Sequence, residues 1–196
     1  MMGTVRGTRE IARAAVKAEL AEVAFDLFRR NGYDQVTVND VAAAAGVSRS
    51  TFLRYFGSKE DAVLSVLDAQ GRQLAEKLRA RPAGEDDWTA LRRSFDFILE
   101  DYRENPSGTL ALTRLVQQTP ALRARRMEKH SGWRPGLAQA LADRAGLPDP
   151  PPLAPLVRAA AALDCLSLAI DRWTSSDGSL DLAALLDEAF AALTDR

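Results

Sequence analysis

The sequence predicts an all-α protein in which an N-terminal three-helix unit, built as a helix-turn-helix, is joined to a C-terminal helical bundle. Three observations support this fold class. Apolar residues recur at steps of three and four, which is the spacing of an amphipathic helix. No persuasive run alternates with the period of two that a strand needs. Glycine and proline separate the periodic segments at positions where helices end or begin.

Residues 1–57 are expected to form the first domain. Its first helix is expected at 9–30 and is ended by Gly32, which supplies the left-handed residue that helix C-termini often need. Two short helices follow at 38–45 and 49–56, separated only by a tight turn. The inward face of the first helix is expected to consist of Ile11, Ala14, Ala18, Ala21, Phe25 and Phe28.

Short polar side chains mark the starts of these helices. Thr37 and Asp40 form a capping-box pattern, in which each side chain bonds a backbone N–H of the other residue. Ser48 can cap the helix that follows it by accepting a backbone N–H. Ser58, with Asp61 at the third helical position, starts a further helix.

Residues 58–196 are expected to form the second domain. A long helix at 58–80 links it to the first domain and ends before Pro82. Pro135 lies inside a later helix, so we predict a kink or break near Trp133. The other helices are expected at about 86–104, 107–117, 121–145, 153–174 and 180–194.

Composition narrows the function classes. Of 196 residues, 46% are hydrophobic and 27% charged, as in globular proteins. One cysteine, Cys165, and one histidine, His130, exclude an intrachain disulfide and a zinc site built from His and Cys within one chain, so we expect no metal and no cofactor. Without a secretory segment or about 20 uninterrupted apolar residues, a cytoplasmic protein with no membrane partner is expected.

The two short helices and their glycine-containing turn have the architecture that places one helix in the major groove of DNA. The helix at 38–45 would brace the recognition helix at 49–56. Arg49 lies in the first turn of the recognition helix, where its guanidinium can donate to guanine O6 and N7 together. Phe52 and Phe56, four residues apart, are expected to face the core.

Other groups suit the phosphate backbone. Thr37, Thr51 and Tyr55 offer hydroxyls, and Lys59 lies in the first turn of the next helix. Tyr55 could instead be a core aromatic, and the basic residues could be a solvated face. The first 17 residues carry four basic side chains against one acidic, a local charge of about +3, from Arg6, Arg9, Glu10, Arg13 and Lys17.

The stretch from Thr37 to Glu60, TVNDVAAAAGVSRSTFLRYFGSKE, resembles the DNA-binding signature of the tetracycline-repressor (TetR) family. The resemblance implies a homodimer whose variable C-terminal domain binds a small molecule and thereby releases an operator. This sequence departs from the family pattern at Leu53, where the family very often has a tyrosine whose hydroxyl reaches a phosphate. The DNA contacts that the resemblance implies are Thr37, Arg49, Ser50, Thr51, Arg54, Tyr55 and Lys59.

Two faces of the C-terminal helices are candidates for contact with an effector, which we expect to be small and hydrophobic. One face gathers residues of the helix at 121–145, and the other gathers residues of the helix at 86–104. Ordinary packing is the alternative for both. The candidate residues are Phe95, Ile98, Tyr102, Leu115, Arg126, His130, Trp133 and Leu137.

The last two helices are expected to form the homodimer interface. The helix at 153–174 is apolar nearly all the way round and must be covered on two sides, and the last helix would complete a four-helix interface. A monomer with a larger core is the alternative. We therefore predict a ligand-responsive DNA-binding repressor and not an enzyme. The competing hypotheses are an enzyme built on a helical bundle and a helical module that binds a protein partner.

Overall fold

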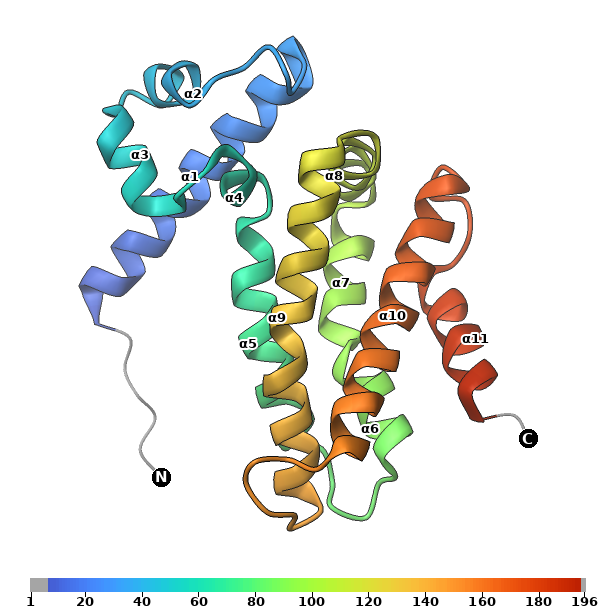
Figure 1. The fold of residues 1–196 in the computed structure, drawn as a ribbon. Coiled ribbons are helices and arrows are strands. Elements are labelled where there is room, and N and C mark those ends of the chain that lie inside the picture. The colour runs from blue at the N-terminus through green and yellow to red at the C-terminus, as the bar shows by residue number, and fades with distance from the viewer. Residues whose placement is uncertain (1–6, 195–196) are drawn as a thin grey trace. The chain divides into compact units, whose positions relative to one another are not determined.

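The computed structural model describes residues 7–194, all of whose regular structure is helical (Figure 1). The chain divides into two compact units, residues 1–65 and 66–196, and each is described by itself. The division lies between Ser65 and Val66, eight residues beyond the boundary expected after residue 57. The all-α fold class is confirmed.

The N-terminal unit consists of α1 (Thr8–Asn31), α2 (Val38–Ala44), α3 (Arg49–Phe56) and α4 (Lys59–Val63). Helix α1 packs against α2 and α4, and α3 packs against α2 and α4. The unit's buried apolar side chains come from all four helices and from the α1–α2 connection; among them are Leu20, Ala24, Phe28, Tyr33, Val36, Val41, Phe52, Phe56 and Ala62.

The inward face of α1 differs from the expected one. Ile11 is 59% exposed, whereas the fully buried residues of the helix are Leu20, Ala24 and Phe28. These three are spaced at steps of four and share one side of the helix. The predicted face was wrong because alanines on several sides of α1 fit more than one helical phase. Phe28 alone belongs to both sets.

The predicted caps are confirmed. The Thr37 hydroxyl accepts the Asp40 N–H, and the Asp40 carboxylate accepts the Thr37 N–H at 2.8 Å, which completes a capping box at α2. Ser48 accepts the Thr51 N–H at 3.1 Å, and Ser58 caps α4 in the same way. Each serine or threonine satisfies an N–H that has no partner inside its helix.

The C-terminal unit is formed by helices that follow one another in space as in sequence. Helix α7 packs on α8, α8 on α9, α9 on α10 and α10 on α11, while α6 packs on both α10 and α11 (Figure 1). The bounds are α5 (Ser65–Arg79), α6 (Asp87–Ser94), α7 (Asp96–Glu104), α8 (Pro106–Gln118), α9 (Pro120–Arg144), α10 (Leu153–Ser175) and α11 (Leu182–Thr194).

Two expected helices are interrupted. The helix expected at 58–80 is split into α4 and α5 at Leu64, and the one expected at 86–104 is split into α6 and α7 at Phe95. Leu64 is 3% exposed and Phe95 is fully buried, and the Phe95 N–H bonds the carbonyl three residues back instead of four. Neither position carries glycine or proline, so no local signal marked these breaks. We predicted a kink or break near Trp133, and α9 continues through Pro135 without a break.

Helix α10 lies in the core of the C-terminal unit. It is the one helix in the described part of the chain with the length and mean hydropathy of a membrane span, 23 residues with a value of 1.7 over its most apolar window. Arg158, Asp164, Asp171 and Arg172 interrupt its apolar sequence, so it contains no run of about 20 uninterrupted apolar residues. Its buried side includes Ala162, Leu166, Ile170 and Trp173, which pack with residues of α6, α7, α9 and α11. Burial in the helical core explains part of this composition, because 44% of that apolar window is buried.

Candidate DNA-binding surface and effector region

Helix α3 separates its apolar side chains from its basic ones. Phe52 is fully buried and Phe56 is 6% exposed, which confirms the expected inward face, and their rings meet at 5.1 Å between centroids. Arg49, Ser50 and Arg54 are exposed, and the helix contains no acidic residue. The outward face of α3 is therefore positively charged. Leu53 is half-buried at its edge and offers no hydrogen-bond donor.

The start of α3 is fixed by a small hydroxyl network. The Ser48 hydroxyl lies 2.9 Å from the Thr51 hydroxyl and 3.0 Å from the Ser50 hydroxyl. Together with the cap on the Thr51 N–H, these contacts hold the first turn, from which Arg49 projects. Thr51 is half-buried, and its hydroxyl already has a protein partner. Ser50 remains exposed.

Tyr55 lies between two arginines. Its ring is half-buried, with the Arg13 guanidinium 5.3 Å and the Arg54 guanidinium 6.0 Å from its centre. This places part of the basic N-terminal segment beside α3. Arg6 and the side chain of Arg9 lie outside the described residues.

Thr37 is exposed at the N-terminus of α2. Its hydroxyl donates to the Asp40 carboxylate at 2.7 Å, and this bond and the Thr37 N–H lower the pKa of Asp40. Asp40 is therefore ionised at neutral pH and holds Thr37 in place. Thr37 and the outward residues of α3 are all at the surface of this unit.

Lys59 is bound within the protein. Its ammonium donates to the carbonyl of Tyr33 at 2.9 Å and to that of Val36 at 3.1 Å, and it lies 4.0 Å from the centre of the Tyr33 ring. Two of its three donors thus hold the connection between α1 and α2. The sequence pattern had indicated a phosphate contact here, and it held no sign of these carbonyl partners.

A second contact holds the same connection. The Tyr33 hydroxyl hydrogen-bonds the Glu60 carboxylate. Burial raises the pKa of Tyr33, and the bond to Glu60 raises it further. Partial burial alone would raise the pKa of Glu60, but the hydrogen bonds from Tyr33 and Ser58 and the charge of Lys59 lower it overall. Sequence reasoning did not identify this pair, which joins residues 27 positions apart.

Most of the candidate effector residues lie in packed surroundings. Phe95, Ile98 and Leu137 are at most 2% exposed and belong to the continuous core of the C-terminal unit. Tyr102 packs edge-on against Trp173 at 5.1 Å, and burial raises its pKa. Leu115 is half-buried on α8. None of these residues lines either of the two cavities described next.

Arg126 and His130, by contrast, line the same groove, which lies between α9 and α10 and has a volume of about 340 Å³. The Arg126 side chain is 12% exposed and pairs with Asp171 of α10 at 3.1 Å. His130 is 8% exposed, and its Nδ1 lies 3.3 Å from the Ser167 hydroxyl. Burial, with a further contribution from the charge of Arg126, lowers the pKa of His130 to about 4. The imidazole is therefore neutral at pH 7.

Trp133 connects this groove with α5. Its ring lies 4.6 Å from that of His130, and on its other side it lies against Gly71. A Cβ at Gly71 would overlap the indole, so only glycine permits this close approach. Trp133 thus packs between His130 on its own helix and the backbone of α5.

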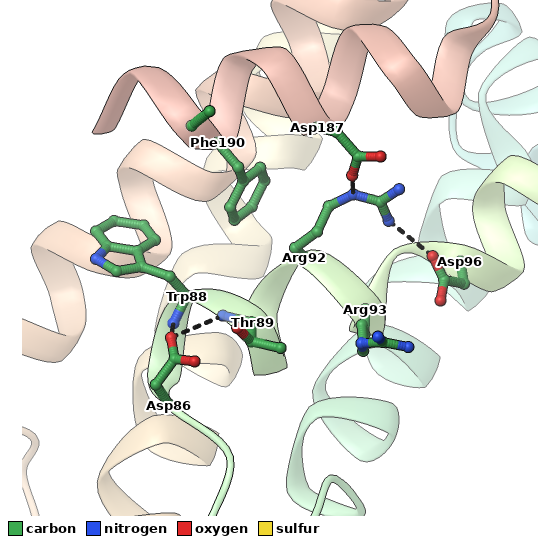
Figure 2. Close-up of a pocket in the computed structure, with 9 residues that line it drawn as sticks. Asp86, Trp88, Thr89, Arg92, Arg93, Asp96, Asp187 and Phe190 are labelled. Carbon is green, nitrogen blue, oxygen red and sulfur yellow. Dashed lines mark hydrogen bonds and ion pairs between the residues drawn. The ribbon is translucent and has the colours of Figure 1, made fainter. Parts of the chain in front are cut away.

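A larger cleft of about 620 Å³ lies between α6 and α11, and Figure 2 shows its lining. Arg92 extends from α6 to Asp187 of α11 and also donates to Asp96 at 2.7 Å. Trp88 and Phe190 form its aromatic side, with ring centroids 6.1 Å apart. The cleft was not predicted, because its residues are distant in sequence and carry no motif. The Arg92 guanidinium at the centre of the cleft is therefore neutralised by the carboxylates of Asp96 and Asp187.

Two family models match this chain. Residues 20–66 match the model of bacterial regulatory proteins of the tetR family, and residues 85–196 match the model of the MftR C-terminal domain. The second match alone covers more than half of the chain. The first contains the whole of α2, α3 and α4.

Individual relatives agree with these models. The HTH-type transcriptional regulator TcmR of Streptomyces glaucescens is 33% identical over 147 residues, 72% of this chain and 65% of TcmR, so the match spans slightly under two thirds of that relative. The regulator MftR of Mycobacterium tuberculosis is 31% identical, and the match covers 68% of each chain.

A solved structure shows the same fold. Thermus thermophilus FadR, a TetR-family transcriptional repressor in complex with lauroyl-CoA, aligns with a TM-score of 0.58 over 91% of this chain and 93% of its own. The sequences are 24% identical, so this likeness concerns the fold alone.

Proposed function

Because this chain belongs to the TetR family of bacterial regulatory proteins and is thus a DNA-binding transcriptional regulator and not an enzyme, we propose that it is a repressor that a small-molecule effector releases from a palindromic operator. The observation that carries the proposal is the outward face of α3, where Arg49, Ser50 and Arg54 are exposed over a buried Phe52. A short helix with this polarity can lie in the major groove.

In this proposal Arg49 reads a base and its neighbours fix the position of the helix on the backbone. Arg49 is in the first turn and has no carboxylate partner in the described chain, so its two-pronged donor is free for guanine. Phosphates would be contacted by Thr37, Ser50, Thr51, Arg54 and Tyr55. Lys59 would act indirectly, because its ammonium holds the α1–α2 connection.

We also propose that α10 and α11 form the interface of a homodimer. Leu153, Val157 and Leu168 are 74%, 55% and 66% exposed and lie on one side of α10. Exposed apolar residues aligned on one helix face favour a partner surface. A two-fold dimer would present two copies of α3 about 34 Å apart, one turn of DNA, which matches a palindromic site.

The effector is proposed to bind in the C-terminal unit. FadR of Thermus thermophilus binds lauroyl-CoA and FadR of Bacillus subtilis, with a TM-score of 0.54 to this chain, binds stearoyl-CoA. These ligands favour an apolar or acyl-bearing effector here. The contact of Trp133 with Gly71 offers a route to the DNA-binding unit, because α5 is continuous in sequence with α4 apart from Leu64. An effector shifts DNA binding only by its differential affinity for two states.

Footprinting on DNA upstream of the gene and of its neighbours tests the proposal. We expect a protected palindrome whose affinity falls steeply with salt, because each neutralised phosphate releases counterions. Arg49→Ala should abolish the footprint at concentrations where the matched control Arg103→Ala, at an exposed position on α7, preserves it. A chain that binds DNA weakly, without sequence preference, and instead captures a protein through α10 and α11 would refute it.

A further inference from the structure

The groove between α9 and α10 is lined by residues of both helices. On α9 its lining includes Arg123, Met127, His130 and Arg134, which recur at steps of three and four and so form one stripe. The stripe extends over three turns, about 16 Å along the helix. The volume of about 340 Å³ lies at the small end of the range for ligand sites, roughly 300 to 1,000 Å³.

The cations of the groove are of two kinds. Arg126 is nearly buried and paired with Asp171. Arg123 and Arg134, at opposite ends of the stripe, are exposed and make no ion pair within residues 7–194. The opposite wall brings one further carboxylate, Asp164, which is exposed. The groove therefore has two cations that are available to a ligand.

The lining of the groove also contains two apolar side chains. Met127 is 64% exposed, and its flexible thioether side chain is suited to irregular apolar contacts. Leu163 of α10 lies in the same lining. The Ser167 hydroxyl and the His130 ring add neutral hydrogen-bonding groups to the wall. An apolar chain laid along Met127 would cover it, and its charged end would reach an arginine.

We propose that the groove between α9 and α10 binds a small molecule in which a carboxylate or phosphate is joined to an apolar chain. This inference rests on the proposed function, because it names the chemistry of the effector. Arg123 or Arg134 pairs with the anion, and Met127 and Leu163 cover the chain. Carboxylates and phosphates share this recognition, because both accept two parallel N–H bonds from a guanidinium.

Calorimetry on the full chain, without DNA, tests the proposal with decanoate, decyl phosphate and decanol below their micelle limits. We expect both anions to bind and decanol to bind at least about tenfold more weakly, because it cannot accept charge-assisted bonds. The double variant Arg123→Gln/Arg134→Gln should lose about tenfold or more in affinity for the anions. Arg103→Gln, an exposed arginine on α7, is the matched control and should bind like the wild type.

The remaining outcomes overturn the proposal. Equal binding of decanol, no binding of any probe, or unchanged affinity in the double variant each contradicts it. Light scattering detects the competing explanation: if the double variant loses only its self-association, the groove is a contact between copies of the chain. Because the readout contains no operator, failure here leaves the DNA-binding proposal to its own footprinting test.

Discussion

The two units use their arginines differently. On α3, Arg49 and Arg54 project from the surface with no carboxylate partner in the described chain. In the C-terminal unit several arginines join helices through ion pairs, such as Arg92 with Asp187 and Arg126 with Asp171. Free cations attract an external polyanion, whereas paired ones fix helix positions. The difference separates an exposed cationic surface on α3 from a bundle in which several cations are paired between helices.

The largest expected effect concerns the buried His130. Its pKa is about 4 in the folded chain against about 6.5 when unfolded, so the unfolded chain takes up a proton first as the pH falls. Stability is full above pH 6.5 and declines toward pH 4 by about 3 kcal/mol. The charged groups that act on the ring are Arg126 and Asp171. Urea unfolding at pH 7, 5.5 and 4.5 measures the decline.

The variant His130→Gln separates the contribution of His130 to the pH dependence of stability from that of the carboxylates. The variant should be less stable at pH 7, because it loses the ring contact with Trp133, but its stability should depend less on pH. Parallel curves for the two proteins would show that His130 is not the responsible group.

Arg49→Ala tests the free cations of α3. We expect a loss of about 1 to 3 kcal/mol in operator affinity together with relaxed preference at one base pair, because a two-pronged guanine contact disappears. Fluorescence anisotropy with the operator and single-base variants measures both quantities. A uniform loss across all sequences would instead assign Arg49 to the phosphate backbone.

Lys59→Met tests whether Lys59, unlike the exposed arginines of α3, acts inside the N-terminal unit. Removing a partly buried ammonium that donates to two carbonyls should lower the unfolding free energy of this unit by about 1 to 3 kcal/mol. Chemical denaturation compares it with Lys77→Met, an exposed lysine of α5. If Lys59→Met keeps full stability and only weakens DNA binding, its role is the phosphate contact expected from the sequence.

The smallest effect is expected at an exposed ion pair of the C-terminal unit. The Arg79 Nε lies 2.9 Å from the Asp143 carboxylate, but the two side chains are 42% and 45% exposed. Asp143→Asn should therefore change the unfolding free energy by less than about 1 kcal/mol. A larger loss of unfolding free energy, measured by thermal unfolding, would mean that such exposed pairs stabilise the unit substantially.

The parts of the molecule that depend on local sequence could be predicted. Thr37, Ser48 and Ser58 fixed three helix starts, and the step from Phe52 to Phe56 identified the buried face of α3. The helix breaks at Leu64 and Phe95 escaped prediction, because burial of the side chain and not a local breaker accompanies them.

Functional residues in the C-terminal unit were harder to predict for the same reason. Phe95 and Leu137 have the apolar character of a pocket lining, yet they are core residues, and only packing distinguishes the two. Lys59 looked available from its position in a first turn, whereas carbonyls 23 and 26 residues away engage its ammonium. Contacts between residues distant in sequence have no signature in a single chain.

The central claim is that Arg49 on the exposed face of α3 reads a guanine. The most direct measurement is a double-mutant cycle between Arg49→Ala and an operator in which that guanine is replaced by 7-deazaguanine, which lacks the N7 acceptor. Either change alone should weaken binding, and 7-deazaguanine should add almost nothing once Arg49 is alanine, because that variant has already lost the bond to N7. Fully additive losses would contradict the claim.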